Sequence, residues 1–261
     1  MVKRLTNGQG ARKPLRMVLA DEIYDTVRAM LLNHEIAPGE RINIDALARD
    51  LDVSQTPVRE ALARLESDEL VIKQPLRGYA ATPVLTVKEL DDLFQFRAVI
   101  EPWAAKSAAD HVNPKAAEEL KAELERGREA GELDIKDAYA AMSEHDARFH
   151  EIIARQSGNE FIRDAFVRTH CHLHLFRLYQ VLQTWMQDSR RDAELVSELF
   201  RLYYQPKGGF LAFREHEAIT EAILDGNGEK AQQLMLDHIE SSRKRFGPTI
   251  EAIQRQSAAG N

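Results

Sequence analysis

Asp146 and His150 have residue types and a spacing that suit the binding of a metal ion. They lie four positions apart in a predicted helix, so they share one helix face. A carboxylate and a neutral imidazole are common ligands of divalent ions. A single histidine on an apolar helix face is nevertheless more often a hydrogen-bonded core residue, so this pair does not define a site by itself.

His216 and His238 add a second observation. Each lies 10 residues from a tight turn, His216 before Gly226 and His238 after Gly228. In an antiparallel helix pair they would lie level with each other, roughly 15 Å from the turn at the rise of about 1.5 Å per residue. Both belong to apolar stripes, and buried imidazoles need polar partners or a metal. Together with Asp146 and His150 they indicate one divalent-ion site, with hydrogen-bonded core histidines as the alternative.

A competing histidine group lies at His170, His172 and His174. In a helix His170 and His174 share a face, whereas His172 points elsewhere. Exposed or core-lining histidines explain this arrangement adequately. We therefore favour the first set of residues as metal ligands.

Arg97 lies on a largely apolar predicted helix, where an unpaired guanidinium is costly. An ion pair with Glu101, four residues further on, would satisfy it. The alternative is a fork that binds the carboxylate of a small-molecule effector, because arginine makes bidentate contacts with carboxylates. The sequence leaves both interpretations open.

These side chains require a helical scaffold. After residue 83 every periodic segment has helical spacing, and Thr86 with Glu89 forms a capping-box pattern. The patterns predict helices over residues 87–110, 114–130, 135–156, 160–186, 189–204, 210–225 and 228–246. This part of the chain is therefore expected to be all-α.

A different pattern precedes the helices. Residues 19–32 predict one helix, and two short helices follow within Asn43–Leu65. The runs Leu70–Ile72 and Tyr79–Thr82 predict two strands joined by a tip at residues 75–78. This order is typical of a winged helix-turn-helix, whose second helix enters the major groove of double-stranded DNA.

The recognition helix and the wing supply the expected DNA contacts. Ser54 and Thr56, at the helix N-terminus, suit phosphate or sugar contacts, and Gln55 suits an adenine. Arg59 lies further along the same helix and is expected to contact DNA, and the alternative is a salt bridge to a nearby acid. Arg77 lies beside a glycine that lets the backbone approach a DNA groove closely. The expected DNA-contacting residues are Ser54, Gln55, Thr56, Arg59, Arg77 and Gly78.

The segment TPVREAL, Thr56 to Leu62, carries a family resemblance together with Pro38-Gly39 before it and Arg77-Gly78 after it. It resembles the winged-helix domain of GntR-family transcription regulators over roughly residues 17–83. Three positions depart from the family pattern. Asp52 and Glu69 stand where turn glycines are usual, and Gln55 stands where many members have arginine, which predicts a different operator.

The helical part resembles the FCD effector domain of the FadR subfamily of GntR regulators. The segments that carry the resemblance are Phe96–Glu101, Asp146–His150, Ser157–Asn159, Glu215–Ile219 and His238. In that family the matching aspartate and three histidines bind a divalent metal under an effector pocket. The resemblance implies the same role for Asp146, His150, His216 and His238, and zinc, manganese, nickel and iron all suit such ligands. The segment around residues 186–212 looks longer than the family's.

Charge is distributed unevenly along the chain. The net charge is −7, yet residues 1–82 carry 12 basic and 12 acidic side chains and are therefore neutral. The net negative charge lies entirely in residues 83–261. Residues 1–16 are basic and contain no acidic side chain. The acidic burden therefore lies outside the expected DNA-binding part.

Compartment features are simple. No apolar run reaches the roughly 18 residues that span a bilayer, and no signal-peptide core is evident. Cys171 is the single cysteine, which excludes an intrachain disulfide. We expect a cytoplasmic protein that does not bind membranes.

The fold class expected is mainly α, with a winged helix-turn-helix followed by a helical bundle. The expected segments are a disordered basic tail at residues 1–16, a DNA-binding domain at 17–83, a metal- and effector-binding domain at 84–250 and a polar tail at 251–261.

We expect a homodimeric transcription regulator that represses metabolic genes and binds a pseudo-palindromic operator. A small carboxylic acid, held by the metal and Arg97, would control it. It is not expected to be an enzyme, because HExxH, GxSxG, Walker and GxGxxG motifs are lacking. The alternatives are a metal-dependent enzyme joined to a DNA-binding module, and a regulator whose metal is purely structural.

Overall fold

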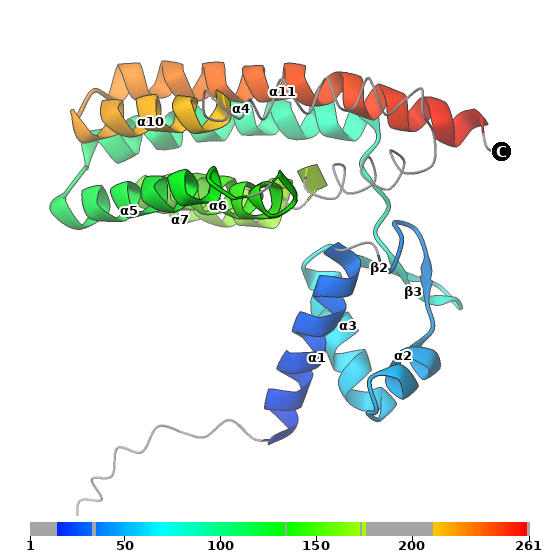
Figure 1. Cartoon of the computed structure of the whole chain (residues 1–261). Coiled ribbons are helices and arrows are strands. Elements are labelled where there is room, and N and C mark those ends of the chain that lie inside the picture. Colours follow the sequence, from blue (N-terminus) through cyan, green and yellow to red (C-terminus); the bar gives the residue numbers. More distant parts are fainter. Residues whose placement is uncertain (1–14, 33–34, 134, 173, 176–210, 260–261) are drawn as a thin grey trace, which may run out of the picture. The chain divides into compact units, whose positions relative to one another are not determined.

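The computed structural model describes residues 15–32, 35–133, 135–172, 174–175 and 211–259. The chain divides into two compact units, Met1–Pro83 and Val84–Asn261 (Figure 1). The fold class predicted from the sequence, a winged helix-turn-helix followed by a helical bundle, is confirmed.

The first unit consists of three helices that pack together and a small sheet that packs against one of them. Its elements are α1 (Leu15–Leu32), β1 (Arg41–Ile42), α2 (Ile44–Asp50), α3 (Gln55–Ser67), β2 (Val71–Gln74) and β3 (Gly78–Ala81). The strand order is β1-β3-β2, and both pairings are antiparallel. α1 and α2 pack against α3, whose Val58, Leu62 and Leu65 are fully buried. The two-residue strand β1 was not predicted, because so short a segment has no readable alternation.

Asp52 and Glu69, which depart from the family's glycines, both keep a left-handed backbone. Their φ angles are 53° and 56°. The left-handed conformation costs roughly 1–2 kcal/mol for a residue with a Cβ, although aspartate tolerates it better than most. The turns therefore have the conformation that a glycine would favour, at some cost in stability.

The second unit is helical throughout the part that the structure describes. Its elements are α4 (Val87–Asp110), α5 (Pro114–Ala130), α6 (Ile135–Gln156), α7 (Glu160–Arg168), α10 (Leu211–Leu224) and α11 (Gly228–Ala259). α4, α10 and α11 pack side by side, over a second group formed by α5, α6 and α7 (Figure 1). Leu120, Phe149, Ile219 and Met235 contribute to the single core between them.

Local sequence signals fix where these helices begin. The capping box of Thr86 and Glu89 is present, with the Glu89 carboxylate accepting from Thr86 N at 2.8 Å. Asn113 and Asn159 cap α5 and α7 through their side-chain oxygens. These predicted caps are confirmed, and each satisfies backbone N–H groups that the first helical turn leaves free.

Two predicted helix ends are wrong. The helix expected over residues 160–186 ends at Arg168, and His170 then adopts a φ of 42°. The last helix continues past residue 246 to Ala259, so most of the expected polar tail is helical, in keeping with the helix-forming residues that follow Pro248.

Other expectations fall partly outside the described residues. These are the basic tail up to residue 14, the helix at 189–204 and the long segment at 186–210. Among the helices that the structure does describe, none combines the length and apolarity needed to cross a membrane.

Candidate metal centre and DNA-binding face

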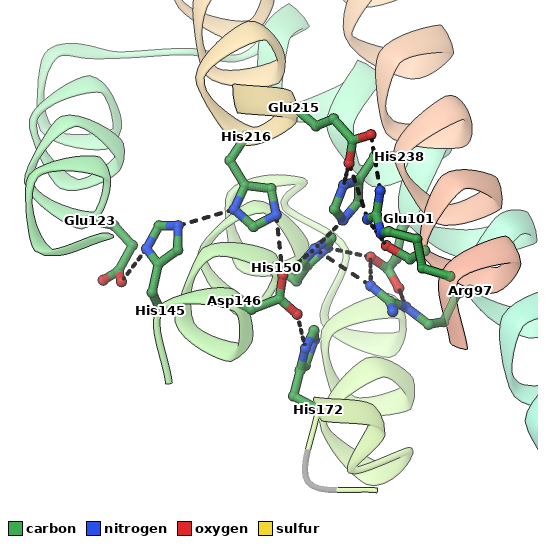
Figure 2. Close-up of polar contacts among 12 residues, drawn as sticks. Arg97, Glu101, Glu123, His145, Asp146, His150, His172, Glu215, His216 and His238 are labelled. Carbon is green, nitrogen blue, oxygen red and sulfur yellow. Dashed lines mark hydrogen bonds and ion pairs between the residues drawn. The ribbon is translucent and has the colours of Figure 1, made fainter. Parts of the chain in front are cut away.

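Asp146, His150, His216 and His238 come together from three helices. One ligand atom from each lies within 4.8 Å of the others. Asp146 and His150 project from α6, His216 from α10 and His238 from α11 (Figure 2). The three imidazoles are buried, and the Asp146 side chain is 25% exposed. The cluster thus lies between the two groups of helices.

The hairpin of α10 and α11 sets two of these residues level. Gly226 has a φ of 66°, and the Asn227 side chain accepts from Lys230 N at 3.1 Å at the start of α11. His216 and His238 face each other across this hairpin, with ring centroids 4.8 Å apart. The two histidines, which lie equally far from the turn in the sequence, therefore lie level with each other in the structure.

His150 and His238 each direct one ring nitrogen toward a carboxylate. His150 Nδ1 lies 2.5 Å from Glu101 Oε2, and His238 Nδ1 lies 2.7 Å from Glu215 Oε2. A carboxylate accepts, so His238 Nδ1 donates to Glu215. His150 Nδ1 is within ion-pair distance of Glu101 but has no partner with hydrogen-bond geometry. The Nε2 atoms of the two rings face each other. Outer partners of this kind are what orient histidine ligands in metal sites.

His216 reaches its carboxylate through a second histidine. Its Nδ1 lies 3.0 Å from His145 Nε2, and His145 Nδ1 lies 3.1 Å from Glu123 Oε1. The buried Nε2 of His216 has no partner with hydrogen-bond geometry, although Asp146 Oδ1 lies 3.3 Å away. Whether this nitrogen carries a proton follows from the hydrogen bond made by Nδ1 of the same ring.

Asp146 is held from its outer side. Its Oδ2 atom lies 2.5 Å from His172 Nδ1, whereas Oδ1 faces the cluster, 3.8 Å from His150 Nε2. The His172 ring stacks on that of His150 with centroids 5.2 Å apart. The helix break after Arg168 positions His172 here. The sequence pattern had predicted that His172 would point away from the face shared by His170 and His174.

The cluster has the donor spacing of a metal site. His150 Nε2 and His238 Nε2 lie 3.2 Å apart, a distance at which two lone pairs repel each other unless a cation lies between them. Ligand bonds of about 2.0–2.2 Å give donor separations of roughly 2.8–3.1 Å at an octahedral edge and 3.3–3.6 Å at a tetrahedral edge. The observed spacings of 3.2 and 3.3 Å are close to these values, and the third, 3.8 Å, is slightly longer. The residues present fit a divalent ion.

Protonation states agree with that fit. Burial lowers the pKa of His150 to about 4, which Glu101 opposes only in part. Burial also holds the pKa of His216 well below its ordinary value. Burial alone would raise the pKa of Asp146, but the charge and hydrogen bond of His172, followed by contact with His216, hold it well below its usual range. At neutral pH Asp146, His150 and His216 are therefore in the forms that bind metals.

Arg97 borders the cluster, on α4. Its guanidinium is 1% exposed and donates to Glu101, with Nε 2.5 Å from Oε1 and Nη2 3.3 Å from Oε2. The intrahelical pair considered from the sequence therefore exists. Nη2 also lies 3.5 Å from His150 Nε2, so the same guanidinium lies beside a candidate metal ligand.

The expected DNA contacts lie exposed on the first unit. Ser54 is the N-cap residue of α3 and makes no side-chain capping bond, and Gln55 and Thr56 follow it. Arg59 Nη2 donates to Gln55 Oε1 at 3.3 Å, so these two side chains lie together on the exposed face of α3. Arg77 and Gly78 are exposed at the wing, where Gly78 has a φ of 84°.

Sequence reasoning missed the outer partners of the ligands. Glu215 and His145 each directly precede a candidate ligand, His216 and Asp146 respectively. A neighbour in sequence points about 100° away around a helix, so adjacency gave no reason to place it at the site. Glu123 lies on a different helix and has no sequence signal that links it to the site.

Comparison with known proteins gives a consistent result. The family described as "FCD domain" matches residues 92–241, and that described as "Bacterial regulatory proteins, gntR family" matches residues 19–80. An uncharacterized HTH-type transcriptional regulator of Bacillus subtilis (strain 168), YdhC, is 26% identical over 88% of this chain and 92% of its own. The putative L-lactate dehydrogenase operon regulatory protein of Escherichia coli (strain K12) is 26% identical over 87% of each chain. The solved structure of E. coli McbR/YncC has a TM-score of 0.60 at 19% identity, over 92% of this chain and 98% of that one, which indicates a shared fold.

Proposed function

The chain belongs to the gntR family of bacterial regulatory proteins and carries an FCD domain, and we propose that it is a cytoplasmic, homodimeric repressor of metabolic genes whose DNA binding responds to a small carboxylic acid. The matched families and named relatives are transcription regulators, not enzymes. Repression is the simplest mode of action, because a protein that covers a promoter needs no further contact to block it.

A divalent metal would be held by Asp146, His150, His216 and His238. The observation that carries this proposal is the 3.2 Å approach of two imidazole nitrogens, His150 Nε2 and His238 Nε2, beside a carboxylate. With four protein ligands, a five- or six-coordinate ion retains one or two positions for other oxygen ligands. When bound, it would supply a fixed positive charge that attracts an anionic effector.

The effector proposed is a hydroxy, keto or sugar acid. Arg97 lies beside the cluster, with Nη2 3.5 Å from His150 Nε2, and a guanidinium binds carboxylates well. An anion that contacts the metal and the arginine together would share the guanidinium with Glu101, which already accepts from it. The E. coli relative is described as a putative regulator of an L-lactate dehydrogenase operon, which agrees with a small-acid effector.

DNA recognition is proposed to use α3 and the wing. Ser54, Gln55, Thr56 and Arg59 are exposed on or beside the first turns of α3, and Arg77 lies at the wing tip. In a dimer, two such helices would read two half-sites of a pseudo-palindromic operator. Effector binding would act by favouring one arrangement of the helical unit, which requires different affinities for the two arrangements.

The test is an operator-binding titration with candidate acids, carried out on three samples: the wild-type protein with metal, the chelated protein and Arg97→Ala. We expect one acid to change operator affinity in the first sample and to lose most of this effect in the other two. An equal response in all three would mean that metal and Arg97 do not bind the effector. Loss of folding on chelation, without any acid response, would support a purely structural metal.

A further inference from the structure

We propose that Glu123 and His145 form a positioning relay, which holds His216 in the tautomer whose Nε2 lone pair faces the other metal ligands. The inference rests on the proposed metal site, and it concerns two residues that lie outside the four-residue ligand set. Figure 2 shows the relay as a chain of contacts that runs from α5 through α6 to α10.

The direction of each hydrogen bond follows from the end of the chain. Glu123 offers a carboxylate oxygen that accepts, so His145 donates from Nδ1 over 3.1 Å. The proposal takes His145 as the neutral ring, which has one donor and one acceptor. His145 then accepts at Nε2, and the donor 3.0 Å away is His216 Nδ1. The remaining nitrogen of His216 is then deprotonated. This is the form that a metal requires.

The carboxylate at the end of the relay is itself anchored. Glu123 is fully buried, and its Oε2 atom accepts from Arg126 Nη2 at 2.5 Å and from Arg148 Nε at 3.2 Å. Both arginine side chains are about half exposed, at 48% and 42%. Arg148 Nε also lies 3.2 Å from Oε1, the oxygen that His145 contacts. Charged donors therefore fix both oxygens, and the acceptor does not depend on mobile water.

A glycine on α5 provides independent support, because it makes room for the relay. A Cβ atom at Gly127 would lie 2.7 Å from Cε1 of His145 and 2.8 Å from Cε2 of Phe213. A glycine inside a helix costs stability relative to alanine, and here the cost has a specific explanation. The His145 ring passes directly over the α5 backbone, where any larger residue would displace it.

The experiment compares the zinc affinity of the full chain in matched variants, by competition with a chromophoric chelator. His145→Phe keeps a ring but removes the acceptor, and we expect it to weaken zinc binding by about 10- to 100-fold. His145→Gln restores a side-chain acceptor and should recover most of the affinity. His111→Phe, the same change at an exposed histidine, should have no effect.

A second measurement needs no variant at the relay. In the metal-free wild-type protein, ¹⁵N NMR of the histidine rings should show His216 protonated at Nδ1, and an Nε2-protonated His216 would overturn the relay. Unchanged affinity in His145→Phe, or an equal loss in His145→Phe and His145→Gln, would overturn it as well. If the wild-type protein takes up no zinc, the proposed metal site fails instead, and the NMR result still decides the tautomer.

Discussion

Replacing Glu101 by glutamine isolates the buried ion pair that borders the metal cluster. Arg97 and Glu101 are 1% and 3% exposed, so the change leaves a guanidinium inside the protein without its counter-charge. Burial alone would raise the pKa of Glu101, but the charge of Arg97 and the contact with His150 hold it well below its usual range, so the carboxylate is ionised at neutral pH.

The expected loss follows from this burial. Removing one partner of a buried pair typically costs about 3–5 kcal/mol, and glutamine still accepts a hydrogen bond, so we expect the lower end, about 3 kcal/mol. In a unit of this size that loss corresponds to a lower Tm by roughly 6–12 °C. Because whole domains have stabilities of only about 5–15 kcal/mol, the effect is large enough to measure directly.

The assay is urea unfolding of chelated protein followed by tryptophan fluorescence. Both tryptophans, Trp103 and Trp185, belong to the second unit, so the signal reports that unit alone. The double variant Arg97→Met with Glu101→Gln removes the stranded charge and should recover most of the loss. A loss below about 1 kcal/mol in Glu101→Gln, or a double variant no more stable than the single one, would refute the reasoning.

Four further predictions concern single residues. His216→Ala should remove most of the bound metal measured by elemental analysis, whereas the exposed control His111→Ala should retain about one ion per chain. Arg59→Ala should weaken operator binding by about 1–3 kcal/mol in a titration at fixed salt, and unchanged binding would contradict its assignment. Glu69→Gly should stabilise the first unit by roughly 1 kcal/mol in chemical denaturation, because its φ is 56°. Burial and a hydrogen bond to the carboxylate of Asp68 raise the pKa of Tyr24 from 10.0 to about 12. The contribution of Tyr24 to the free energy of unfolding is therefore complete below pH 10 and is lost as the pH rises toward 12. Tyr24→Phe should abolish this pH dependence of the unfolding free energy.

The helical scaffold was predictable because its signals are local. Asn113, Asn159 and the Thr86–Glu89 box each act within four residues, and each appears where the sequence placed it. The convergence of His216 and His238 followed from equal distances to a turn. A one-dimensional pattern is sufficient for such features, since helix geometry converts spacing into position.

The outer partners of the ligands could not be predicted in the same way. The contact from Glu123 to His145 joins two helices, and its geometry depends on how closely they pack at Gly127. His172 reaches Asp146 only because α7 stops at Arg168, where the sequence pattern favoured a continuous helix. Contacts of this kind depend on interhelical distance and on local breaks, which propensity and periodicity do not specify.

The position of Arg97 and Glu101 on α4 bears on how the proposed effector signal would leave the site. Arg97 lies ten residues after Val87, the first residue of the helix, which corresponds to roughly 15 Å at about 1.5 Å per residue. The Thr86–Glu89 box fixes the first turn. The part of α4 before Pro102 is capped in this way and is buried along Leu90 and Phe94, so close packing would make it move as one body. A displacement at the arginine would therefore reach residues 82–86, the link to the first unit, without a separate chain of contacts. What the signal requires is an effector that distinguishes two positions of α4, because equal affinity for both would shift nothing however tightly it bound.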